Sequence, residues 1–217
     1  MHGWGKDLWH KFMNNGISTI NLAEAPGDLS YNIDKTSQTI MFWVDKSCEK
    51  VVEVTLNKSQ TEANILGLVL VDENVEVVLK TLQIHASPKT KSNLLVKSVL
   101  GGRAKFHFDG IIKVHKQAQL TDAYQRNENL LLSDESKAVS KPALEILAND
   151  VRCTHSATVS HLDNEQLFYL ESRGLPEKKS QFMLIESYLS PILEKIEERK
   201  VKDYLIHRAQ QILESAN

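Results

Sequence analysis

A cysteine and a histidine stand two positions apart in the stretch CTHSATVSHLDNEQLFYL, which spans residues 153–170. The residues around the pair favour a β-strand, and side chains two positions apart on a strand point to the same face. Cys153 and His155 are therefore expected to project together. A thiolate and an imidazole are both ligands for zinc and iron, so this pair is the first candidate for chemistry in the chain.

Two ligands do not complete a metal site. A closed tetrahedral site takes four, so the others would have to come from another strand, another chain or a substrate. His161 shares the parity of His155 but lies too far along a straight strand, which leaves His107 and His115 as the nearest other ligands. No CxxC, HExxH, GxSxG or phosphate-binding loop accompanies the pair. Taken alone, these residues favour a packed thiol beside a hydrogen-bonded histidine over a metal site.

Composition narrows the class of protein. The chain has 217 residues and a net charge of −2, so it offers no general basic field for nucleic acid. The N-terminus has no continuous apolar stretch typical of a signal peptide, and no segment approaches the roughly 18 apolar residues of a membrane span. We therefore expect a soluble cytoplasmic protein with reduced thiols at Cys48 and Cys153. Cys48 has no second ligand near it in sequence and is interpreted as incidental.

The central part of the chain, residues 36–161, predicts one strand after another. Its short apolar segments are rich in β-branched residues and are separated by turn signals about every 15 residues. No helical segment interrupts them, which argues against βαβ units. A sandwich, a barrel and a β-helix solenoid all fit this pattern. The regular spacing, together with Asn127, Asn129 and Asn149 expected near coil corners, favours the solenoid.

The two flanks differ from this body. Residues 1–35 are interpreted as an N-terminal cap or loop segment, and residues 162–217 as a helical region. Asp163 is placed to cap the first helix and Gly174 to follow its end. Pro191 is expected to end or kink the second helix, and a third helix is expected to follow it. The predicted architecture is an all-β body with an α-helical tail of about three helices.

Residues 121–175 resemble the SufD branch of the SufB/SufD family of iron–sulfur cluster assembly scaffold proteins. The matching blocks are YQRNENLLLS at 124–133, KPALEILANDVRCTH at 141–155, ATVSHLDNEQLFYL at 157–170 and SRGL at 172–175. The resemblance implies a right-handed parallel β-helix followed by a small helical region, shortened at the N-terminus to about half the usual family length. Family members often have glycine where this chain has Ser156 and Ser160.

The resemblance also implies a function. It predicts a non-catalytic scaffold subunit that pairs through its β-helix, with a SufB-like subunit or with itself, and binds a SufC-type ATPase through its C-terminal helices. His155 occupies the position of the family histidine that contributes to the cluster site between the paired subunits, and Cys153 matches the neighbouring cysteine. The implied cofactor is a transient iron–sulfur cluster, which the isolated chain is not expected to retain.

The ATPase contact is expected on the first tail helix, at Phe168, Tyr169, Arg173 and Gly174. Two other functions remain open from the sequence. One is a purely structural partner subunit that never contacts iron. The other is a β-helix protein acting on carbohydrate, although the clustered Asp, Arg or Lys side chains of such a site are not evident on any one strand.

Overall fold

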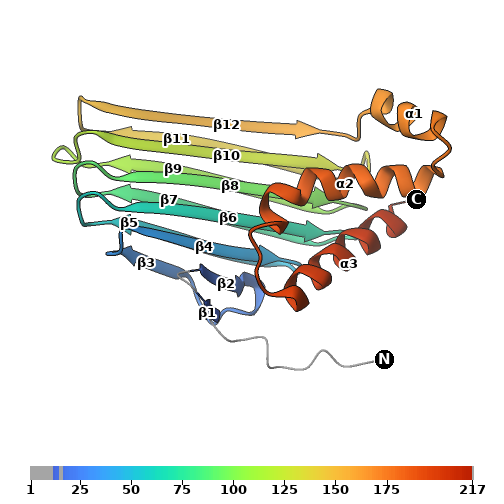
Figure 1. Ribbon diagram of the computed structural model, residues 1–217, viewed down its shortest axis with the longest axis horizontal. Coiled ribbons are helices and arrows are strands. Elements are labelled where there is room, and N and C mark those ends of the chain that lie inside the picture. Colours follow the sequence, from blue (N-terminus) through green and yellow to red (C-terminus); the bar gives the residue numbers. More distant parts are fainter. Residues whose placement is uncertain (1–11, 15–16, 217) are drawn as a thin grey trace.

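The computed structural model describes residues 12–14 and 17–216. Twelve strands, a short 3-10 helix η1 (Leu22–Glu24) and three α-helices make up this part of the chain (Figure 1). The strands are β1 (Phe12–Asn14), β2 (Ile17–Asn21), β3 (Leu29–Ile33), β4 (Ser37–Val44), β5 (Cys48–Leu56), β6 (Glu62–Val71), β7 (Glu76–His85), β8 (Lys91–Leu100), β9 (Lys105–Val114), β10 (Thr121–Leu131), β11 (Lys137–Ile146) and β12 (Val151–Ser160). The helices are α1 (Asn164–Ser172), α2 (Glu177–Leu193) and α3 (Arg199–Ser215).

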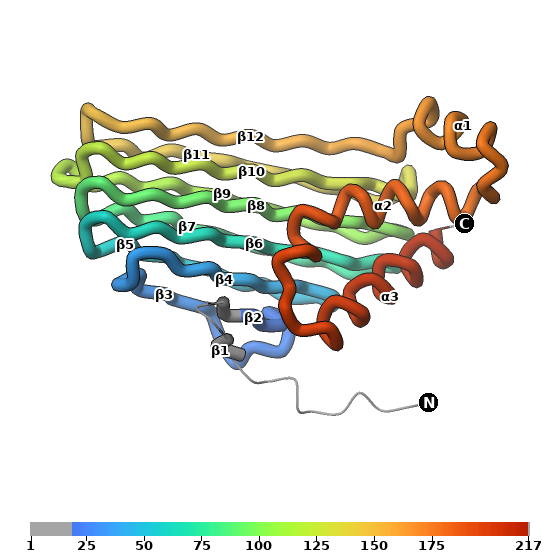
Figure 2. The backbone as a smooth tube through the Cα atoms, viewed as in Figure 1, coloured from blue at the N-terminus to red at the C-terminus, as the bar shows by residue number. Residues whose placement is uncertain are grey.

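From β2 onward, successive strands along the chain belong alternately to two sheets. One sheet has the order β1-β2-β4-β6-β8-β10-β12, and the other has the order β11-β9-β7-β5-β3. All strand pairs are parallel except β1 with β2, which are antiparallel. The chain therefore climbs from sheet to sheet as a coil (Figure 2). This arrangement is a parallel β-solenoid followed by three helices, and it confirms the predicted fold class.

From β6 onward the coils of the larger sheet repeat with a nearly constant length. Ala63, Ser92, Ala123 and Cys153 stand in register on neighbouring strands of the larger sheet, so successive coils are 29, 31 and 30 residues long. Parallel neighbours in such a sheet lie roughly 4.8 Å apart. Residues on the inner face of one coil are therefore stacked directly on those of the next.

The interior of the solenoid changes character along its axis. Its apolar core includes Phe42 on β4 and Phe106 on β9, which are almost completely buried. The Phe42 ring lies over Gly67, where a Cβ atom would approach the ring to 2.4 Å. From β7 onward, buried polar side chains stand among the apolar ones, including Gln83, His85 and Gln125. Gln125 lies on β10, the strand next to β12.

Helices α2 and α3 cover the outer face of the larger sheet (Figure 1). They form a second apolar core with outward side chains of that sheet, such as Met41 and Leu68. Polar contacts hold α3 in place: Arg208 Nη2 lies 2.6 Å from Asp72 Oδ1, and Ser215 Oγ donates to Asp72 Oδ2 over 2.9 Å. This core therefore attaches the helical tail to the body.

Three details differ from the sequence-based expectations. Strands β1, β2 and β3 lie within residues 1–35, so solenoid pairing begins before the predicted boundary at residue 36. Pro191 lies inside α2, whose last residue is Leu193, and α3 begins only at Arg199. The helix accommodates this proline because the carbonyl of Ser187, which lacks its usual amide donor, accepts from the Ser190 hydroxyl over 2.9 Å.

The expected corner asparagines are the third difference. Asn149 does lie at the corner between β11 and β12, but Asn127 and Asn129 are buried in the middle of β10. Asn129 Nδ2 donates to Asn127 Oδ1 over 2.8 Å and to the carbonyl of Thr158 on β12 over 2.9 Å. Ser140 on β11 donates to Asn127 Oδ1. These amides tie the last two strands to the coil beneath them.

Candidate functional site

Cys153 and His155 lie side by side on the inner face of β12. In the register of β12 with β10, Cys153 is opposite Ala123 and His155 is opposite Gln125. Ala123 and Gln125 are buried inside the solenoid, so their partners on β12 face the same interior. The structure thus brings the two residues predicted from the sequence to one face of one strand.

The last coil is open at its outer side. Within the described chain, β12 pairs with β10 alone and β11 pairs with β9 alone, so each ends its sheet with a free edge. Inner-face side chains that would be buried elsewhere are exposed here: Leu144 by 40%, Ile146 by 37% and Val159 by 51%. Figure 2 shows no strand above β12, and α1 lies beyond its C-terminal end. Cys153 and His155 therefore belong to an uncovered layer of the solenoid interior.

The two side chains have different surroundings. Cys153 is half-buried against the apolar cluster that includes Val114 and Ala148, whereas His155 is exposed. Burial raises the pKa of the Cys153 thiol, hydrogen bonding to the backbone of Ala123 partly lowers it, and the Asp122 carboxylate raises it further. The thiol is therefore protonated at neutral pH, and a metal ion bound there would have to displace the proton.

The other ligands considered from the sequence do not join this pair. His107 lies on the outer face of β9, where its Nε2 is 3.6 Å from Glu76 Oε1. Cys48 belongs to β5, far from β12 in the strand order. In the part of the chain that the structure describes, no group of three or more His, Cys, Asp or Glu side chains is arranged to hold a metal ion. Within the described residues, Cys153 and His155 are thus two candidate ligands without a third beside them.

Beneath this layer lies a polar cluster that sequence reasoning missed. The Gln83 Nε2–H donates to Ser92 Oγ over 2.7 Å, and His85 contacts Ser92 Oγ through Nε2 at 2.8 Å and Thr90 Oγ1 through Nδ1 at 2.7 Å. Burial lowers the pKa of His85 to about 4. The sequence did indicate that these side chains point inward. Gln83 and His85 occupy the same alternate positions of the strand as its buried apolar residues.

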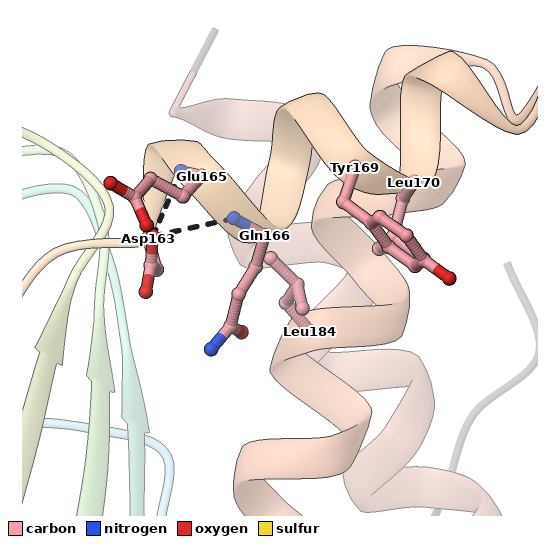
Figure 3. A pocket seen from close by; sticks show the side chains of 6 residues that line it. All are labelled: Asp163, Glu165, Gln166, Tyr169, Leu170 and Leu184. Carbon is pink, nitrogen blue, oxygen red and sulfur yellow. Dashed lines mark hydrogen bonds between the residues drawn. The ribbon is translucent and has the colours of Figure 1, made fainter.

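Helix α1 carries the residues predicted to bind a partner. The Asp163 carboxylate accepts from the backbone N–H groups of Glu165 and Gln166 at its start (Figure 3). No residue of α1 is buried, and Phe168 and Tyr169 expose 73% and 57% of their surface. The predicted helix start is thus confirmed, and the helix presents aromatic side chains to solvent.

The end of α1 is also formed as predicted. Gly174 follows the helix with a φ of +88°, a conformation that glycine adopts readily, and its N–H donates to the Glu171 carbonyl over 2.8 Å. The Arg173 guanidinium lies 5.2 Å from the centre of the Tyr169 ring, a cation–π arrangement. An open hollow of about 450 Å³ separates α1 from Leu184 on α2 (Figure 3). Phe168, Tyr169, Arg173 and Gly174 are thus all exposed at the end of the molecule, with Tyr169 and Arg173 in contact.

Comparison with known proteins identifies the family. No helix in the described residues is long and apolar enough to cross a membrane. A family model described as "SUF system FeS cluster assembly, SufBD core domain" matches residues 19–188. The iron–sulfur cluster assembly protein SufD of Escherichia coli is 32% identical over 158 residues, which are 73% of this chain and 37% of that protein.

Two further relatives agree. An iron–sulfur cluster assembly SufBD family protein of Synechocystis is 34% identical over 146 residues, covering 67% of this chain and 32% of the relative. The chloroplastic protein ABCI7 of Arabidopsis thaliana is 35% identical over 130 residues, which cover 57% of this chain and 27% of that protein. The alignments thus span only about a third of each of these relatives. The matches confirm the resemblance inferred from residues 121–175, and the chain belongs to the SufBD family of iron–sulfur cluster assembly proteins.

Proposed function

We propose that this chain is a non-catalytic cytoplasmic scaffold subunit that pairs through the open end of its solenoid and holds a nascent iron–sulfur cluster at the junction. The observation that carries the proposal is the position of Cys153 and His155. They share the inner face of the last strand, in the one layer of the solenoid interior that the described chain leaves uncovered.

The free edges of β11 and β12 support pairing. An unpaired strand edge presents backbone N–H and C=O groups that a strand of another chain can satisfy. The exposed inner side chains Leu144, Ile146 and Val159 supply apolar surface that a second solenoid would bury. Pairing with a SufB-like subunit or with a second copy of this chain would therefore cover the edge and the interior together.

Pairing would also supply the metal ligands that a single chain lacks. Cys153 and His155 provide one thiolate and one imidazole, whereas iron in a cluster takes further ligands. Residues from the paired chain would reach the same layer because that layer is the junction. The cluster is then cargo of the pair, assembled and released there, and a single chain holds it weakly.

Anaerobic reconstitution with ferrous iron and sulfide tests the proposal. Absorption in the visible region is recorded for the chain alone, with a SufB-type subunit, and with that subunit and a SufC-type ATPase. We expect a cluster on the assembled complex, its loss in His155→Ala, and wild-type yield in His161→Ala, which removes an exposed histidine just beyond β12. Normal yield from His155→Ala would overturn the assignment and favour a structural partner subunit without iron contact.

The exposed face of α1 supports a contact with the ATPase. Interface energy concentrates in a few large side chains, mainly aromatic residues and arginine, and α1 with its C-cap exposes Phe168, Tyr169 and Arg173. Phe168→Ala should leave folding unchanged because its side chain is exposed, yet weaken ATPase binding about tenfold or more. Isothermal titration calorimetry measures this. Leu120→Ala removes a side chain that is 50% exposed on a solenoid corner and serves as the matched control.

A further inference from the structure

Gln125 is an anomaly in the interior of the solenoid. Its side chain is fully buried, and neither Nε2 nor Oε1 has a hydrogen-bond partner within the described residues. Gln83, an equally buried glutamine of the same interior, uses its Nε2–H to donate to Ser92 Oγ and to the Tyr124 carbonyl. A buried amide without partners destabilises the fold, so its retention calls for a role outside folding.

The amide of Gln125 lies directly below the layer that contains His155. Gln125 and His155 are opposite each other on the parallel strands β10 and β12, and both face the interior. The amide lies against Gly110 on the other sheet, where a Cβ atom would come within 2.2 Å of Nε2. Pro142 stands above Gly110 in the register of β11 with β9. Neighbouring parallel strands are roughly 4.8 Å apart, so the His155 ring and the Gln125 side chain occupy adjacent layers, and the ring would have to turn toward β10 to bond this amide.

A histidine that binds a metal through one ring nitrogen almost always donates its other ring N–H to a fixed acceptor. That hydrogen bond sets the tautomer and the orientation of the ring, and it raises the affinity of the ring for the metal. The exposed ring of His155 has room to turn, and Gln125 Oε1 is an acceptor without a donor on the adjacent strand. Gly110 keeps the amide in place because no side chain at that position displaces it.

We propose that Gln125 is the positioning residue for His155: its Oε1 accepts the free ring N–H when His155 binds iron. This inference rests on the proposed function, because it assumes that His155 is an iron ligand. It also explains why an unsatisfied amide is tolerated, since binding of the metal supplies the missing donor.

Cobalt(II) titration with visible absorption tests the role, because Co²⁺ replaces Fe²⁺ and its absorption bands report coordination. The titration uses the chain alone and the chain mixed with a SufB-type subunit. We expect Gln125→Met, and Gln125→Leu as a second apolar variant, to bind Co²⁺ about 10–100-fold more weakly than the wild type. Both should unfold at the same temperature as the metal-free wild type or higher. Gln125→Glu keeps an acceptor oxygen and should restore binding.

A matched control separates positioning from packing. Gln83→Met also removes a buried amide, but it deprives Ser92 of a donor, so it should lower the unfolding temperature and leave Co²⁺ affinity unchanged. If Gln125→Met and Gln125→Leu lose stability while their Co²⁺ affinity stays at the wild-type value, Gln125 is a structural residue and the inference is wrong. If His155→Ala itself leaves Co²⁺ binding unchanged, the proposed function fails instead.

Discussion

His85 should make the stability of this protein depend on pH. Its ring is completely buried between β7 and β8 in a chain of hydrogen bonds. The Thr90 hydroxyl donates to the Ser87 carbonyl, so His85 Nδ1–H donates to Thr90 Oγ1 and Nε2 accepts from the Ser92 hydroxyl. Gln83 Nε2–H in turn donates to Ser92 Oγ. This series of hydrogen bonds stabilises the neutral imidazole ring of His85, and a proton added at Nε2 would break the series.

The size of the effect follows from the pKa. Burial lowers the pKa of His85 from 6.5 to about 4 in the folded state. Between these values the unfolded chain binds a proton that the folded chain does not. The stabilisation is thus complete above pH 6.5 and is lost as the pH falls toward 4. Each pKa unit corresponds to about 1.4 kcal/mol, so the loss reaches about 2 kcal/mol at pH 5 and about 3 kcal/mol below pH 4.

Urea denaturation at pH 7.5 and pH 5 measures this loss. Carboxylates and other histidines also titrate in this range. The informative quantity is therefore the pH-dependent change in unfolding free energy of the wild type compared with that of His85→Gln. The change in unfolding free energy between the two pH values should be about 2 kcal/mol smaller in the variant. For a chain of this size that corresponds to a midpoint shift of about 0.7–1 M urea. His161→Gln, at an exposed site, should behave like the wild type.

Equal pH dependence in the wild type and in His85→Gln would refute the reasoning. It would mean that the folded protein accepts a proton at His85 as easily as the unfolded chain does. The hydrogen-bond chain through Ser92 and Thr90 would then have to reorganise without cost.

Three other changes test the packing. Gly67→Ala places a Cβ atom against the Phe42 ring and should lower the unfolding free energy by about 1–3 kcal/mol, measured by urea denaturation; no loss would show that the ring moves freely. Asp72→Ala leaves Arg208 without its carboxylate and should cost about 3 kcal/mol and speed amide hydrogen exchange in α3; unchanged exchange there would contradict the clamp. Tyr188→Phe removes a 2.7 Å hydrogen bond to a β10 carbonyl and should cost about 1 kcal/mol by thermal unfolding, and an unchanged midpoint would show that the bond contributes nothing.

Local signals in the sequence were reliable. The segments chosen for their β-branched, apolar composition are strands, and the helix start at Asp163 and the glycine at residue 174 are formed as expected. Each depends on neighbours within a few residues: the alternation of a strand, a capping carboxylate, or a residue with positive φ. The spacing of Cys153 and His155 is local in the same sense, so their shared face was predictable.

Features that depend on the register between strands could not be predicted from the sequence. Asn127 and Asn129 were expected at corners, but they are buried in β10, because the coil length decides which residues lie inside. The sequence did not predict a role for Gln125 for the same reason. Only its alignment with His155 and its contact with Gly110 distinguish it from other glutamines. Pro191 was expected to end or kink α2; the helix continues through it to Leu193, and the Ser190 hydroxyl satisfies the carbonyl that the proline leaves free.

The sequence by itself determined the strands, the helical tail and a cysteine–histidine pair on one strand face. Only the tertiary structure decided that β12 is the last strand of its sheet, that its inner face is uncovered, and that Gln125, with its unpartnered amide, stands opposite His155 on the neighbouring strand. The physical reason is that strand alternation is a two-residue property, whereas stacking in this solenoid joins residues 22 to 32 positions apart.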